Sequence, residues 1–134
     1  MWLSTLTGSL ERQVSMEKVN LADKLSQFSE PWSPKIVGTV QGMDVKLVKL
    51  QGEFVWHQHD DQDEMFFVVT GRLLLKFRDR DVWLDEGEFL IIPRGVEHLP
   101  VAEAEVHVML IEPQGTLNTG NVQNERTVSD LQRL

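Results

Sequence analysis

The sequence contains no cysteine and no tyrosine among its 134 residues. The absence of cysteine excludes disulfides, thiolate nucleophiles and every metal or iron–sulfur site that uses cysteine ligands. The absence of tyrosine removes the phenol as a general acid, so any catalysis depends on His, Asp, Glu, Lys, Arg or a metal ion. Serine is also missing between Ile36 and Glu112. A serine-based hydrolytic triad within that stretch is therefore excluded.

Long apolar runs and an excess of positive charge are missing as well. The longest apolar runs, such as Met65 to Val69, have the length of one strand, far below the roughly 20 residues that cross a bilayer. Thirteen Lys and Arg against 21 Asp and Glu give a net charge of -8, which repels phosphate backbones and anionic lipid. We therefore expect neither a membrane nor a nucleic acid as a partner. The opening residues lack the pattern of a secretory signal, which favours a cytoplasmic protein.

The N-terminal zone, residues 1–34, is an extension that contains one short helix. Asn20 is suited to cap a helix, and the apolar side chains that follow fall on one helical stripe, made of Leu21, Leu25 and Phe28. Two prolines further along end the pattern, because proline cannot continue the hydrogen-bond ladder of a helix. We therefore predict a short helix directly after Asn20.

The remaining chain divides into a β-rich zone and a polar tail. Residues 35–112 consist of short runs rich in Val, Leu, Ile and Phe, separated by turn residues at intervals of about 8 to 16 residues. This spacing is typical of an all-β sandwich or barrel. Residues 113–134 are rich in Gly, Asn and Thr, and we predict a loop followed by one helical turn near residues 127–134.

Two of the expected strands are apolar on both faces. Met65–Val69 and Leu73–Leu75 contain no polar residue at either parity. A second element must therefore cover each of them, and a helix, a terminal segment or another subunit would all serve. We expect a homodimer.

The histidines of the β-rich zone suggest a metal site. His57 and His59 are two residues apart on an expected strand, so their side chains leave the same face. If the chain returns antiparallel through the acidic turn that follows, Glu64 lies across from His59 and Phe66 across from His57. Imidazole and carboxylate together suit Zn, Fe, Mn, Ni, Co or Cu rather than Ca or Mg.

Two spaced motifs extend over residues 52–102. The first consists of Gly52, four residues, His57-Gln58-His59, four residues, Glu64, six residues and Gly71. The second consists of Gly87, five residues, Pro93-Arg94-Gly95, two residues and His98, with Ala102 in its last position. Both resemble the two sequence motifs of the cupins, which are small β-barrel proteins. The family pattern has five residues after its leading glycine and an Asn in the last position.

The resemblance implies an all-β fold, the cupin double-stranded β-helix or jelly-roll-like barrel, over residues 35–112. It also implies that His57, His59, Glu64 and His98 bind one divalent transition metal ion (Fe, Mn, Ni or Zn). An octahedral ion would keep about two positions for water or a small-molecule substrate. The alternative is that these four are solvated residues at a barrel mouth, but their joint match to both motifs favours a metal.

Four further residues are candidates for roles around this site. His107 lies in a late strand that is apolar on both faces; it is either a surface histidine or, if it points inward, a catalytic base. Glu97 is the other candidate base. Arg94, on the same loop, is either a solvated charge or an anchor for an anionic substrate, and Phe66 is core or pocket wall.

These observations favour a metalloenzyme that acts on a small oxygen-bearing molecule. The cupin resemblance implies sugar isomerases, dioxygenases and decarboxylases as precedents, so isomerase, dioxygenase and lyase chemistry remain open. The alternative is a non-catalytic module that binds or senses a small ligand at the same site.

Overall fold

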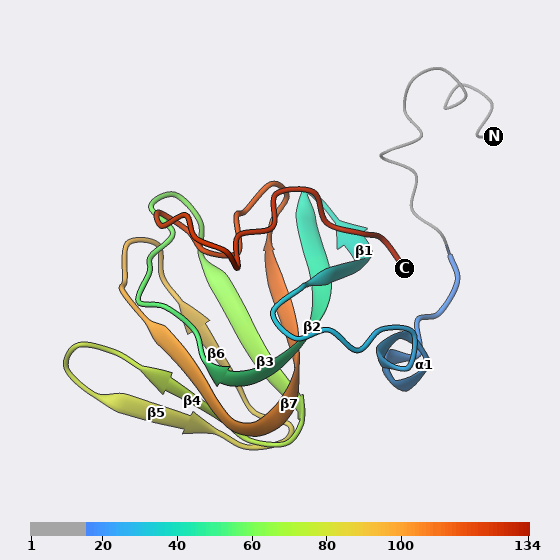
Figure 1. Ribbon diagram of the computed structural model, residues 1–134. Coiled ribbons are helices and arrows are strands. Elements are labelled where there is room, and N and C mark those ends of the chain that lie inside the picture. The colour runs from blue at the N-terminus through green and yellow to red at the C-terminus, as the bar shows by residue number, and fades with distance from the viewer. Residues whose placement is uncertain (1–15) are drawn as a thin grey trace.

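Short apolar runs separated by turn residues form seven strands in the computed structural model, which describes residues 16–134 (Figure 1). The strands are β1 (Lys35–Val40), β2 (Met43–Glu53), β3 (Glu64–Thr70), β4 (Leu73–Lys76), β5 (Asp81–Leu84), β6 (Phe89–Ile92) and β7 (Leu99–Pro113). Residues 1–15, which belong to the expected N-terminal extension, lie outside the described part of the chain. The expectation of an all-β architecture is confirmed.

All pairs among the seven strands β1 to β7 are antiparallel, and β7 has the most partners. The sheet runs in the order β1-β2-β7-β3-β6, and β4 pairs with both β5 and β7. At 15 residues β7 is the longest strand, and its two halves pair with different partners: β2 follows most of its length, β3 pairs with its second half and β4 with its first. This bent strand closes the sheet around an apolar interior.

The interior is filled by side chains that alternate along the strands. Val48, Val68, Leu75 and Val108 come from four different strands and are buried in one cluster. Because strands such as β3 are apolar on both faces, a second element must also cover their outward-facing residues.

Part of that cover is the helix α1 (Leu21–Leu25), which is capped by the predicted residue. The Asn20 side chain accepts a hydrogen bond from the Asp23 backbone N–H at 3.0 Å. The apolar stripe packs on the outer face of the sheet, where Leu25 meets Val37 and Leu47. Among residues 16–134, no helix is long and apolar enough to cross a membrane.

The C-terminal segment is not helical at its end, so the predicted turn of helix near residues 127–134 is wrong. After β7 the segment crosses one end of the sheet and returns to β1, as the red ribbon in Figure 1 shows. Its last residues are extended and pair with β1: Ile36 donates to the Gln132 carbonyl at 2.9 Å and accepts from Leu134 at 3.0 Å. The Leu134 side chain packs with the α1 cluster. Strand pairing and this burial outweigh the weak capping signal.

The outer face beyond α1 is apolar and partly open. Strand register places eight apolar residues in two rows across four strands: Val45, Ile111, Met65 and Ile91 in one, and Leu47, Met109, Phe67 and Phe89 in the other. Burial decreases from β2 toward the edge strand β6, where Phe89 is 58% and Ile91 54% exposed. A terminal segment therefore covers one half of this face and leaves the other half accessible.

The homodimer stays a prediction, and this open half makes it testable. If two copies pack through it, Phe89→Glu places a charge in the apolar contact and should shift sedimentation velocity toward monomer. Val40→Glu is the matched control, since Val40 is 57% exposed on β1, away from the two rows. A wild-type protein that sediments as a monomer at high concentration would contradict the prediction.

Candidate metal centre

The first histidine motif is held by the second through main-chain hydrogen bonds. His57 N–H donates to the His98 carbonyl at 3.1 Å, and His98 N–H donates to the His57 carbonyl at 2.9 Å. Gly95 N–H adds a bond to the His59 carbonyl at 2.8 Å. The sequence predicts a hairpin that pairs this segment with β3, and that pairing is wrong. Both edges of β3 are occupied by β6 and β7, so the histidine segment pairs with residues around His98 instead.

The C-terminal segment holds the other side of the same residues. Gln58 N–H donates to the Asn121 side-chain oxygen, and Asn121 N–H donates to the Gln58 carbonyl, both at 3.0 Å. Gly120 lies so close that an added Cβ would stand 2.2 Å from the Gln58 oxygen and 3.2 Å from the His57 ring. Sequence reasoning missed both residues, because a polar tail gives no local signal of what it contacts.

Two of the three imidazole rings are oriented by identical local bonds. The Nδ1 atoms of His57 and His98 each lie 2.9 Å from the carbonyl oxygen two residues earlier, Val55 and Val96 respectively. A carbonyl oxygen only accepts, so the ring proton sits on Nδ1. The Nε2 atom of each ring then carries the lone pair that binds a metal ion.

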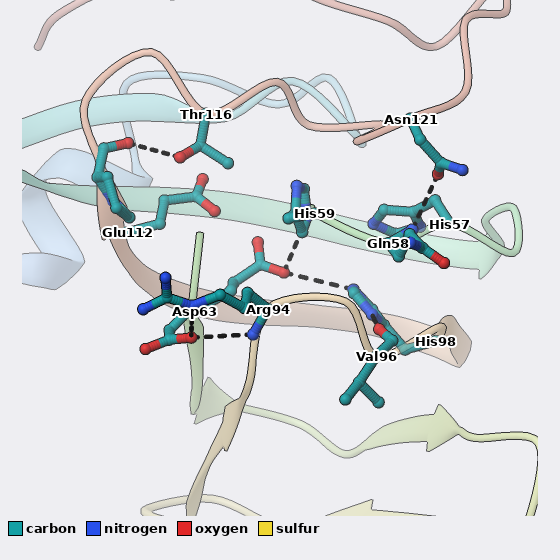
Figure 2. Close-up of polar contacts among 12 residues, drawn as sticks. His57, Gln58, His59, Asp63, Arg94, Val96, His98, Glu112, Thr116 and Asn121 are labelled. Carbon is teal, nitrogen blue, oxygen red and sulfur yellow. Dashed lines mark hydrogen bonds and ion pairs between the residues drawn. The ribbon is translucent and has the colours of Figure 1, made fainter. Parts of the chain in front are cut away.

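The four residues implied by the two motifs converge in one buried cluster, called here the His–Glu cluster: His57, His59, Glu64 and His98. One donor atom from each lies within 4.8 Å of the others, and all four residues are buried. Nε2 of His59 and Nε2 of His98 lie 3.3 and 3.4 Å from one carboxylate oxygen, Oε1 of Glu64. Figure 2 draws both contacts as dashed lines from the two labelled histidines.

The donor atoms of this cluster fit a metal ion. Three buried atoms in it have no hydrogen-bond partner: Nε2 of His59, Oε1 of Glu64 and Nε2 of His98. Leaving such atoms unpaired costs about 1–3 kcal/mol each. One cation between them would satisfy all three at once, and three imidazoles with one carboxylate suit a first-row transition metal.

Burial shapes the charges of this region. Burial, and then the charge of His98, lower the pKa of His57 to about 4. Burial opposes ionisation of Glu64, but the imidazole nitrogens of His59 and His98 hold the pKa of this carboxyl well below its ordinary value. Burial and the Glu64 carboxylate raise the pKa of Glu112 well above its ordinary value, and the neighbouring Lys46 ammonium opposes this shift. Ionised Glu64 is thus the anionic ligand.

Sequence reasoning missed two buried charges beside the cluster, Lys46 and Glu112. They form an ion pair of 2.7 Å between Nζ and Oε1. The alternation of side chains along a strand could have identified them. Lys46 is two residues from the inward-facing Val48 on β2, and Glu112 is two residues from the inward-facing Leu110 on β7. A charge on an apolar face is the informative exception to a buried pattern.

A narrow cavity of about 30 Å³ adjoins the cluster, with room for roughly two water molecules. His57 and Glu64 border it, together with apolar side chains that include Phe66. Trp32 closes one wall: its ring stacks on Phe54 at 4.6 Å, and the Phe54 ring meets His57 edge-on at 5.3 Å. Trp32 has a φ of 62°, an uncommon conformation for a bulky residue, and hydrogen bonds to strand β2 hold it there.

The other candidates lie in different places. Phe66 is buried, borders the cavity and has its ring 6.1 Å from that of His98. His107 lies on the outer face of β7, with Nε2 at 2.7 Å from Glu105. Glu97 and Arg94 are surface residues, paired with Arg78 and Asp63 respectively. The structure therefore brings Phe66 to the cluster and leaves the two candidate bases and Arg94 away from the cavity; their functional roles stay predictions.

Comparison with known proteins identifies the family. The family model described as "Cupin domain" matches residues 45–112. An uncharacterised protein of Bacillus subtilis (strain 168), YdbB, is 34% identical over 80 residues, which cover 59% of this chain and 71% of that protein. The chain belongs to the cupin domain family.

Solved structures agree with this assignment. A cupin-2 domain containing protein from Shewanella frigidimarina NCIMB 400 is 47% identical, with a TM-score of 0.71 over 72% of this chain and 94% of that one. Protein NMB1881 from Neisseria meningitidis is 34% identical, with a TM-score of 0.68 over 73% of this chain and 100% of that one. The predicted cupin fold is confirmed, and the His–Glu cluster is typical of cupin metal sites.

The low pKa of His57 predicts a pH dependence of the metal-free protein. A histidine with a pKa of about 4 when folded, against an ordinary value of 6.5, binds fewer protons folded than unfolded between these values. Its contribution to stability is therefore complete above pH 6.5 and is lost as the pH falls toward 4, by about 3 kcal/mol in total. The free energy of unfolding, measured by urea titration, should fall more steeply with decreasing pH for the wild type than for His57→Gln. Parallel curves for the two proteins would contradict the assignment.

The close approach of Gly120 predicts a second effect. Gly120→Ala forces Cβ into the Gln58 carbonyl and should both destabilise the protein and weaken metal binding, because Gln58 lies between two cluster histidines. Gly115→Ala is the matched control: Gly115 also has a positive φ, but its Cβ would meet nothing within 4 Å. The control should cost about 1–2 kcal/mol from backbone strain alone and leave metal affinity unchanged. Equal metal affinities for the two variants, measured by titration, would show that Gly120 does not position the cluster.

Proposed function

We propose that this cupin binds one divalent transition metal ion through the His–Glu cluster and uses it as a metalloenzyme acting on a small oxygen-bearing molecule. The supporting observation is the convergence of three unpaired, buried donor atoms from His59, Glu64 and His98 next to a cavity. Iron, manganese, nickel or zinc would each suit this donor set.

The surroundings of the cluster limit what it can process. When bound, such an ion polarises an oxygen of the substrate or, if it is iron, binds dioxygen. His57 and Glu64 are the ligands that face the cavity, so a substrate would approach on their side. The rest of the wall is largely apolar. The side-chain amide of Asn118 in this wall already donates to the Arg126 carbonyl and accepts from Val128 N–H.

This lining favours a compact substrate held mainly through the ion. A polyol would find few hydrogen-bond partners there, and burying its hydroxyl groups unpaired is costly. The position of Phe66, which borders the cavity next to the His98 ring, supports its assignment as part of the pocket wall. Any molecule larger than the present cavity must displace part of the lining.

The second candidate function is a non-catalytic module that binds or senses a small ligand at the same ion. One observation favours it: neither His107 nor Glu97 borders the cavity, so no titratable side chain outside the cluster is seen in its described lining. Proton transfer would then depend on the cluster itself or on water. Isomerase, dioxygenase and lyase chemistry are distinguished from simple binding by turnover of a substrate.

Metal content tests the shared part of both candidates. Protein purified without chelator should contain about one transition metal ion per chain by elemental analysis, and the double variant His57→Ala/His59→Ala should contain none while keeping its β-sheet circular dichroism. Glu64→Gln should retain the site with weaker binding, because an amide donates less to a cation than a carboxylate does. His107→Ala is the matched control and should keep the full metal content, since His107 lies on the outer face.

The outcome against the proposal is equally clear. Stoichiometric metal in the double variant would remove the ligand assignment. A wild type that holds no metal after reconstitution with each of the four ions would indicate a metal-free ligand-binding barrel.

A further inference from the structure

Lys46 and Glu112 form a buried ion pair inside the barrel. Their side chains are 2% and 1% exposed, and Nζ lies 2.7 Å from Oε1. The Lys46 ammonium also points toward the Thr116 carbonyl at 3.5 Å, and the other carboxylate oxygen of Glu112, Oε2, has no hydrogen-bond partner. Removing two charges from water costs several kcal/mol per ion, and such pairs are often replaceable by apolar residues without loss of stability. Stability alone therefore gives no reason for this pair.

The pair lies directly beside one ligand of the His–Glu cluster. Met65 on β3 pairs with Ile111 on β7, and this register sets Glu64 next to Glu112 on the inner face of the sheet. The two carboxyl groups interact electrostatically. In Figure 2 the Glu112 carboxylate points toward the side of the cluster where His59 lies.

Glu112 lies on β7, the strand between β2, which carries Lys46, and β3, which carries the ligand Glu64. Oε1 of Glu64 lies 3.3 Å from His59 Nε2 and 3.4 Å from His98 Nε2, while Lys46 is paired with Glu112. A buried carboxylate that had access to Lys46 would be drawn to it and away from the imidazoles. Because the Lys46 ammonium is already paired with Glu112, the Glu64 oxygen remains directed at the histidine nitrogens.

We propose that the Lys46–Glu112 pair positions Glu64 and thereby sets the affinity and the preference of the His–Glu cluster for divalent ions. Glu112 is a positioning residue and not a ligand. This inference rests on the proposed metal function. Carboxylates that bind a metal are generally held in place by neighbouring residues, and mutation of such a neighbour lowers metal affinity about 10- to 100-fold. We assign this positioning role to Lys46 and Glu112.

The test measures metal binding rather than turnover. Wild type and Glu112→Gln are loaded with Co²⁺, and Zn²⁺ affinity is obtained by competition with a chromophoric chelator. Glu112→Gln should still bind one ion per chain, with a Zn²⁺ dissociation constant raised about 10- to 100-fold and a changed Co²⁺ d–d spectrum. A merely structural role would lower the unfolding temperature of the metal-free protein but leave the spectrum and the dissociation constant unchanged.

Two further variants keep the test decisive. Lys46→Met/Glu112→Leu removes both charges at once and should fold even where the single variant does not, with the same loss of affinity and the same spectral change. Lys35→Met is the matched control, because Lys35 is likewise a buried strand lysine with one ion-pair partner, Glu30, and it belongs to a different strand. Its metal affinity should equal that of the wild type.

The results separate this inference from the proposed function. If the wild type binds no Co²⁺ or Zn²⁺, the metal function itself fails. If the wild type binds one ion and Glu112→Gln binds it with equal affinity and an identical spectrum, the metal function stands and the positioning role is overturned.

Discussion

The candidate site depends on the reciprocal main-chain hydrogen bonds between His57 and His98. These bonds join the two motifs, although no regular strand contains His57. They fix the distance between the rings, whose centroids are 4.3 Å apart, while a carbonyl two residues before each histidine fixes its tautomer. Ligand geometry is therefore set by the backbone, and Asn121 on the other side keeps that backbone in place.

Around this bridge the barrel tolerates an unusual concentration of buried polar groups. An apolar interior normally excludes unpaired charge, yet Glu64, Glu112 and Lys46 lie within it next to three imidazoles. Their compensation is incomplete, since Nε2 of His59 and of His98, Oε1 of Glu64 and Oε2 of Glu112 have no hydrogen-bond partner. Buried polar groups of this kind contribute little to the stability of a fold, whereas they are the groups that a cation site requires.

Sequence patterns spanning a few residues correctly predicted the helix and the strands, because these elements depend mainly on interactions between residues close in the sequence. The stripe of Leu21, Leu25 and Phe28 marked the helix, although it ends at Leu25 and Phe28 packs beyond it, and turn residues between apolar runs marked the strands. The same reasoning failed where pairing partners compete. The C-terminal residues near Leu134 pair with β1 rather than form a helical turn, and β3 has no free edge for the histidine segment. Propensity acts within a few residues, whereas these outcomes depend on which edges are already occupied.

The sequence by itself determined the donor types, their spacing and the family, because two motifs with set intervals can be read without a structure. Tertiary structure decided which face of each strand is the inside, since alternation has two equivalent parities until strands pair. That choice buries Lys46 and Glu112 beside Glu64 and puts His107 on the outer face. It also brings Gly120 and Asn121, which no local pattern connects to the histidines, against the segment that holds them.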